Sequence, residues 1–284
     1  MAQFTNQARL SYNDTVTVSN VAVGEIVDAL SITKTAVRST YSINDSITYV
    51  VSIVNSGSVS YSGVTLTDNL GEYTFGSGTL VPLEYIDISV KYYINGILQP
   101  APAVTTAPQL SISGLSVPAG GNTTVIYEAN INQFAPINDG GQIVNEVTAS
   151  GGGINEITAT ETVFAATGPS LSITKSISPV PVSPNGIVTY TFTIRNSGNT
   201  PIVATDNAVI SDLFNPILTD LQATFNSAPW VVGTNYTYDQ LSGLFESVPG
   251  QITVNAATYT QDPVTGEWTI TPGVSVLTVT GKIQ

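Results

Sequence analysis

Two lysines stand out among the few side chains of this sequence that can do chemistry. There is no Cys and no His, which excludes disulfides, thiolate chemistry and the commonest general base and zinc ligand. Side chains alternate between the two faces of a β-strand, so Lys34 in LSITK shares a face with Leu30 and Ile32. Lys175 ends a second LSITK in the same way. Both ammonium groups are therefore expected to point into an apolar core.

Inward-facing acids and amides accompany the lysines. By the same alternation, Asp68 in VTLTD and Asp212 in AVISD face the core. Asn145 in IVNEV and Asn6 in FTNQA do so as well. Burial lowers the pKa of a lysine and raises that of an acid, and a neutral amine is a nucleophile. Asp206, in VATDN, is a rival to Asp212 because its TDN matches the TDN of the first motif, although its flanks fit a strand less well.

The composition predicts that strands position these residues. Val, Ile, Thr and Tyr are abundant, 24 Gly and 16 Pro punctuate short segments, and no stretch keeps helical spacing for three turns. The 284 residues suffice for two domains, since single hydrophobic cores usually stop growing at about 250 residues. We therefore expect an all-β chain of two domains.

An internal repeat supports two modules in tandem. LSITKT begins at Leu30 and LSITKS at Leu171, and each leads through a Thr- and Tyr-rich strand to an Asn-Ser-Gly turn. The first module is expected at residues 29–166 and the second at residues 167–284. The second lacks the final strand pair that the first one has, so its sandwich is expected to be incomplete.

The missing strand pair has its match at the amino terminus. QFTNQARLSYND, from Gln3, aligns with QIVNEVTASGGG, from Gln142, and places Asn6 on Asn145. Residues 1–28 are therefore expected to be a donor strand pair that completes a neighbouring subunit, because an incomplete sandwich exposes an apolar groove and unpaired backbone groups. The alternatives are a loose or self-packed extension, or a segment of a longer array.

The motifs LSITK, NSG, VTLTD and IVNEVTAS together resemble a bacterial surface-repeat family catalogued as domain of unknown function 11, over most of both modules. Similar domains occur in collagen-adhesin-type proteins. The resemblance implies immunoglobulin-like β-sandwiches and a self-formed isopeptide bond between Lys and Asn, promoted by a nearby acid. Two such bonds are expected, each with a lysine, an asparagine and a promoting acid: Lys34, Asn145 and Asp68 within the first module, and Lys175, Asn6 and Asp212 between subunits.

Buried polar residues have a simpler reading as well. The lysines could form an unreacted buried cluster with the acids, or reach out of the sandwich edge, because buried charge is usually paired rather than reactive.

The charge narrows the expected partners. Seven Lys and Arg against twenty Asp and Glu give a net charge of −13, which opposes binding to nucleic acid or anionic lipid. No signal peptide and no membrane span are visible. No cofactor, no metal and no catalysis on an external substrate are expected.

Together these features predict a self-assembling structural subunit of an extracellular fibre on a bacterial cell or spore surface. Its main partner would be a second copy of itself, joined head to tail, with a tip or anchor protein as a further partner. The alternative is a monomeric adhesin or stalk segment that binds a host or matrix ligand.

Overall fold

The computed structural model describes residues 2–26, 29–107 and 109–284. Residues 1, 27, 28 and 108, which belong to the expected donor pair and first module, lie outside the described residues. The predicted all-β fold with sandwich-like sheets is confirmed. Among the described residues, no helix is long and apolar enough to cross a membrane.

The chain separates into two compact units. The division into tandem immunoglobulin-like modules with the boundaries given above stays a prediction. The two units comprise these segments: Met1–Asn132 with Ile143–Val163 in the first, and Gln133–Gln142 with Phe164–Gln284 in the second.

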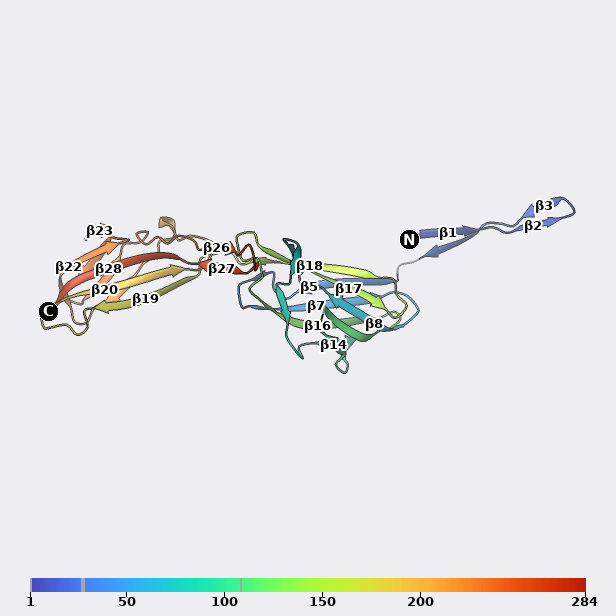
Figure 1. Cartoon of the computed structure of the whole chain (residues 1–284), viewed down its shortest axis with the longest axis horizontal. Helices are drawn as coiled ribbons and strands as arrows, with labels where there is room; N and C mark the ends of the chain where they lie inside the picture. Colours follow the sequence, from blue (N-terminus) through green and yellow to red (C-terminus); the bar gives the residue numbers. More distant parts are fainter. Residues whose placement is uncertain (1, 27–28, 108) are drawn as a thin grey trace. The chain divides into compact units, whose positions relative to one another are not determined.

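One sheet of the first unit carries Lys34 on an outer strand. Its strands pair in the order β13-β12-β16-β7-β5, and β11 also pairs with β16. Figure 1 labels β5, β7 and β16. Alternate residues of the central strand, such as Tyr49 and Val51, are buried, as the period of two predicts. The strands are β5 (Leu30–Ala36), β7 (Ser46–Asn55), β11 (Leu83–Tyr85), β12 (Lys91–Ile94), β13 (Ile97–Leu98) and β16 (Asn122–Ile131).

The other large sheet of this unit has the order β14-β15-β8-β17-β18-β6. Its β8 lies between two antiparallel neighbours, with Asp68 opposite Leu110 on one side and Val147 on the other. Three successive glycines with positive φ, Gly151 to Gly153, form the turn that follows β17. The strands, with a separate β9–β10 hairpin, are β6 (Thr40–Tyr41), β8 (Tyr61–Asp68), β9 (Tyr73–Phe75), β10 (Gly78–Leu80), β14 (Ala103–Thr105), β15 (Leu110–Val117), β17 (Gln142–Gly151) and β18 (Ile157–Ala165).

The second unit has a five-stranded sheet in the order β19-β20-β28-β22-β23, whose strands are labelled in Figure 1. It also has a three-stranded sheet in the order β21-β25-β24. A short hairpin, β26–β27, and one 3₁₀ turn, η1, complete it. Its elements are β19 (Leu171–Ser178), β20 (Ile187–Asn196), η1 (Ala204–Asp206), β21 (Ser211–Leu213), β22 (Leu218–Phe225), β23 (Ala228–Trp230), β24 (Tyr236–Asp239), β25 (Leu244–Ser247), β26 (Thr258–Gln261), β27 (Trp268–Thr271) and β28 (Gly273–Ile283).

The repeat is visible in hydrogen bonds that close the Asn-Ser-Gly turns. The buried Asn55 accepts from the backbone N–H of Gly57 at 2.9 Å and donates to the carbonyl of Val59 at 2.7 Å. The buried Asn196 accepts from Gly198 at 3.0 Å and donates to Thr200 at 2.7 Å. The same side chain thus closes the same turn in both units.

The two units differ beside the strand that carries the aspartate. In the first, β8 pairs with both β15 and β17, whereas in the second β21 ends its sheet and pairs with β25. Both β15 and β25 end in a similar motif, which is SVPA for β15 and SVPG for β25. This motif identifies the two strands as counterparts. Within the described residues, no strand therefore pairs with β21 on the side that corresponds to β17.

The amino-terminal strands form a hairpin of their own. In it β1 (Ala2–Asn6) pairs with β4 (Ala22–Ile26), and β2 (Arg9–Tyr12) pairs with β3 (Thr15–Val18). Asn13 and Asp14, both with positive φ, form the turn, as a type I′ hairpin requires. Among the described residues, these strands pair with no strand of either sandwich. We call this segment the amino-terminal hairpin.

Candidate functional site

Lys34 and Asp68 form a buried ion pair between the two sheets of the first unit. Nζ of Lys34 lies 2.6 Å from Oδ2 of Asp68, and the two side chains are 0% and 2% exposed. The ammonium nitrogen also lies 4.9 Å from the ring centre of Tyr49. Burial lowers the pKa of Lys34 to about 8, although the negative charge of Asp68 opposes this shift.

The Asp68 carboxylate accepts further hydrogen bonds. The hydroxyl of Tyr127, from β16, donates to the same Oδ2 that accepts from Lys34. The backbone N–H of Leu70 donates to Oδ1 at 2.9 Å. These donors fix the orientation of the carboxylate and leave one face of it directed at the lysine.

Asn145 reaches the same cluster from β17. It is 0% exposed, and its Oδ1 accepts from the backbone N–H of Gly71 at 3.2 Å. Its Nδ2 lies 3.5 Å from the hydroxyl oxygen of Tyr127, to which it donates. The structure therefore brings together all three residues that the sequence predicted for this site, with Tyr127 joining the acid to the amide.

The cluster contains the groups that an amide exchange needs. Lys34 supplies an amine, Asp68 a proton acceptor and donor, and Asn145 a carbonyl carbon with an amide leaving group. The N–H of Gly71 points at the oxygen that would become negative when an amine adds to this carbonyl. Lys34, Asp68 and Asn145 are buried from solvent, and electrostatic interactions are stronger there than in water.

Lys175 and Asp212 form a similar pair in the second unit, and Nζ of the lysine donates to Oδ2 of the aspartate. The ammonium group lies 4.6 Å from the ring centre of Tyr190, the counterpart of Tyr49, and 5.2 Å from that of Phe214. The lysine side chain is nevertheless 40% exposed and that of the aspartate 17%. The pair is assembled but open to solvent.

The exposure extends along the strand that carries this lysine. In β19, Leu171 is 51% exposed and Ile173 is 54% exposed. Their counterparts in β5, Leu30 and Ile32, are partly buried. An apolar strand face that the first unit covers is thus uncovered in the second.

The other two predicted residues lie on other elements. Asp206, the rival acid, lies in η1 and accepts from the backbone N–H of Val203 at 2.8 Å, while Asp212 holds the lysine. Asn6 is exposed in the amino-terminal hairpin, opposite Ala22, so its contact with Lys175 of another copy stays a prediction.

Tyr127 and Gly71 were missed by the sequence reasoning. Tyr127 alternates with Val125 and Ala129, which are buried, so its inward direction was readable from the strand pattern. The donor at Gly71 had no such signal, because a backbone N–H is present at every non-proline residue and its direction depends on the turn.

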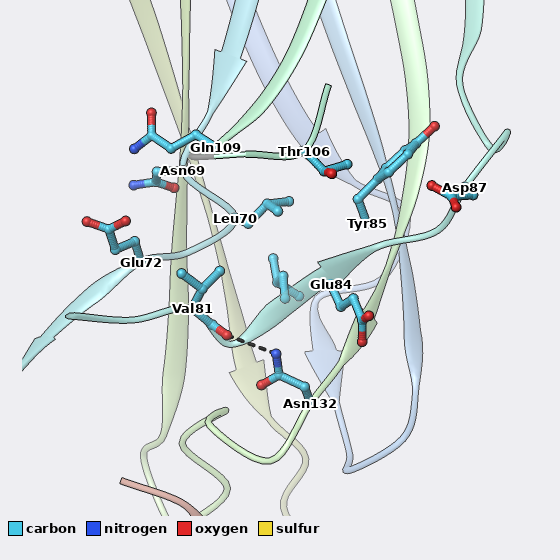
Figure 2. A pocket seen from close by; sticks show the side chains of 11 residues that line it. Asn69, Leu70, Glu72, Val81, Glu84, Tyr85, Asp87, Thr106, Gln109 and Asn132 are labelled. Carbon is cyan, nitrogen blue, oxygen red and sulfur yellow. Dashed lines mark hydrogen bonds between the residues drawn. The ribbon is translucent and has the colours of Figure 1, made fainter. Parts of the chain in front are cut away.

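A surface pocket of about 490 Å³ lies near the end of β8 and was also not predicted (Figure 2). Asn132 closes one side by donating from Nδ2 to the carbonyl of Val81 at 2.9 Å. Lys34 and Asn145 do not line it. Its side chains are mostly acids and amides, with one tyrosine: Asn69, Leu70, Glu72, Val81, Leu83, Glu84, Tyr85, Asp87, Thr106, Gln109 and Asn132.

Comparisons with known proteins gave structural likenesses alone. No protein-family model and no curated protein sequence matches the chain, so membership of the surface-repeat family stays a prediction.

Three of the similar solved structures are surface proteins of Gram-positive bacteria. The major pilin subunit of Bacillus cereus is 12% identical with a TM-score of 0.37, covering 98% of this chain and 74% of that one. A carboxyl-terminal fragment of the major pilin of Streptococcus agalactiae is 12% identical with a TM-score of 0.35, covering 87% and 91%. The collagen-binding domain of a Staphylococcus aureus adhesin is 13% identical with a TM-score of 0.29, covering 49% and 99%.

Proposed function

We propose that this chain is a self-assembling structural subunit of an extracellular fibre on a bacterial cell or spore surface. One observation supports the proposal: among the described residues, no strand pairs with β21 on the side where the first unit has β17, while a separate hairpin has the sequence pattern of β17. An unpaired strand edge beside an exposed apolar face is a site for strand addition.

The hairpin has the residues that such an insertion needs. The inward residues of β17 include Ile143 and Asn145, which are 1% and 0% exposed. The aligned residues of the hairpin are Phe4, which is 56% exposed, and Asn6. In this alignment, insertion beside β21 would bury Phe4 and bring Asn6 to the Lys175 pair, as Asn145 is brought to Lys34.

The contact would join the hairpin of one copy to the second unit of another. Because it uses two different surfaces, it propagates from copy to copy and builds a fibre unless it closes into a ring. The main partner is therefore another copy of this chain, and a tip or anchor protein would occupy the unmatched surface at a fibre end.

Isopeptide bonds would make the fibre permanent. Within a subunit, Lys34 would bond to Asn145 with Asp68 as the promoting acid. Between subunits, Lys175 would bond to Asn6 with Asp212 in that role. Non-covalent contacts dissociate by mass action, whereas an amide bond does not, so the fibre would survive boiling in detergent.

Electron microscopy of the purified full-length chain tests the proposal. The intact chain should form long fibres, and a chain without Met1 to Val27 should form none, because its second unit would receive no strand. Normal fibres from the truncated chain would exclude assembly through this hairpin. A monodisperse monomer from the intact chain, seen by light scattering, would instead favour the adhesin or stalk function, for which the pocket in Figure 2 is one candidate binding site.

A further inference from the structure

The hydroxyl of Tyr127 lies between the acid and the amide of the first site. It donates to Oδ2 of Asp68 and lies 3.5 Å from Nδ2 of Asn145. Its ring is 1% exposed and stacks on that of Tyr49, with the ring centres 5.5 Å apart. The phenol oxygen is thus held next to the nitrogen that would leave during an amide exchange.

This phenol keeps its proton at neutral pH. Burial raises the pKa of Tyr127 well above its ordinary value, and the nearby charge of Asp68 acts in the same direction. A neutral phenol can accept a proton from one neighbour while giving its own to another. The side chain therefore suits a proton relay.

We propose that Tyr127 is a further catalytic residue of the bond between Lys34 and Asn145, and that it passes a proton from Asp68 to the departing nitrogen of Asn145. The inference rests on the proposed function, because it concerns the reaction proposed there. The 3.5 Å contact would shorten as the amide carbon becomes tetrahedral.

The protons balance along this path. The Lys34 ammonium gives one proton to Asp68 and attacks the amide carbon of Asn145 as a neutral amine. Tyr127 gives its proton to Nδ2 and takes the one that Asp68 carries, the bond between the carbon and Nδ2 breaks, and ammonia leaves. The attacking nitrogen then gives a second proton to Asp68. The products are a secondary amide, ammonia and a protonated Asp68.

The matched substitutions Tyr127→Phe and Tyr92→Phe test this role in the full chain. Each removes the hydroxyl of one buried tyrosine of the first unit. The Tyr92 hydroxyl lies outside the cluster and accepts a hydrogen bond from the backbone N–H of Ser116 at 2.8 Å. The chains would be made by cell-free synthesis and quenched in denaturant at set times. Mass spectrometry of their digests would then count peptides joined through Lys34 and Asn145.

The expected result is a selective loss of rate. Tyr127→Phe should slow bond formation by about 10²-fold or more and still reach completion, as the loss of one general acid does. Tyr92→Phe should react at nearly the parent rate. Equal rates for Tyr127→Phe and the parent, or equal slowing by both substitutions, would overturn the inference.

Two further arms keep the test decisive. If Tyr127→Phe does not fold, 3-fluorotyrosine at position 127 keeps the shape and changes the acidity of the phenol. A changed rate then supports the relay, and an unchanged rate overturns it.

If the parent chain never forms the bond, the proposed cross-link itself is wrong and so is the inference that depends on it. If the parent chain forms the bond and Tyr127→Phe forms it equally fast, only the relay is contradicted.

Discussion

Tyr127 and Val279 occupy the same place in the two units. Tyr127 lies opposite Tyr49 in the pairing of β16 with β7, and Val279 lies opposite Tyr190 in the pairing of β28 with β20. Since Tyr49 and Tyr190 are counterparts in the repeat, the second unit has an aliphatic side chain where the first has the phenol beside Asp68.

This difference predicts two rates of cross-linking. The bond between Lys34 and Asn145 should form about 10²-fold faster than the bond between Lys175 and Asn6, because the second site lacks the phenol that would protonate the leaving group. A time course of both cross-linked peptides measures the ratio of the two rates. The bond within a subunit is timed from the folding of that subunit, and the bond between subunits is timed from docking. Equal rates after docking would mean that another donor serves the second site.

The promoting acid of the first site can be removed with little change of shape. Asp68→Asn should abolish the loss of about 17 Da that marks ammonia release, or slow it by about 10²-fold, because the carboxyl group exchanges protons with both reactants. Intact-mass measurement after full denaturation reads the outcome. Asp87→Asn, at an exposed acid of the same unit, is the matched control and should keep the parent mass loss.

The pKa of Lys34 predicts how the rate depends on pH. In the proposed path the proton that Lys34 releases stays within the pair that it forms with Asp68, so the rate should not change with pH just below about 8. Above that pH Lys34 loses this proton to solvent, and the rate should fall by about tenfold for each pH unit. The check is the rate of mass loss at neutral and alkaline pH. A rate that rises through pH 8 would contradict a path that keeps this proton.

A charge on the inward face of the hairpin should prevent docking. Phe4→Asp places a carboxylate where the aligned Ile143 is 1% exposed, so fibre formation should require an at least about hundredfold higher protein concentration. Thr5→Asp is the control, since the aligned Val144 is 43% exposed. Sedimentation of fibres at a series of concentrations compares the two. Equal inhibition by both substitutions would contradict the proposed strand register.

The bond between subunits can be separated from docking. Asn6→Ala should still allow fibres to form but should abolish the ladder of oligomers that survives boiling in detergent, because no amide remains for Lys175 to attack. Asp212→Ala should give the same result with both reacting partners present. Gel electrophoresis and mass spectrometry of digested fibres read these outcomes. Fibres that resist boiling while Lys175 and Asn6 are both recovered unmodified would exclude this bond.

The alternation of side chains along each strand was enough to predict three residues of the first site. The period of two put Lys34, Asp68 and Asn145 on inward faces, and the repeat assigned counterparts to the first two in the second unit. The excess of strand-forming residues likewise predicted the all-β fold. These features are readable because they depend on local geometry, which is the same in every strand.

The tertiary structure decided which groups meet. The contact of Tyr127 with both Asp68 and Asn145 joins strands of two different sheets, and its distances follow from how these sheets pack. The exposure of Lys175, in the same LSITK motif as the buried Lys34, likewise follows from which strands cover it. Sequence spacing sets the face of a side chain, but the burial and pKa of that side chain depend on its neighbours in space.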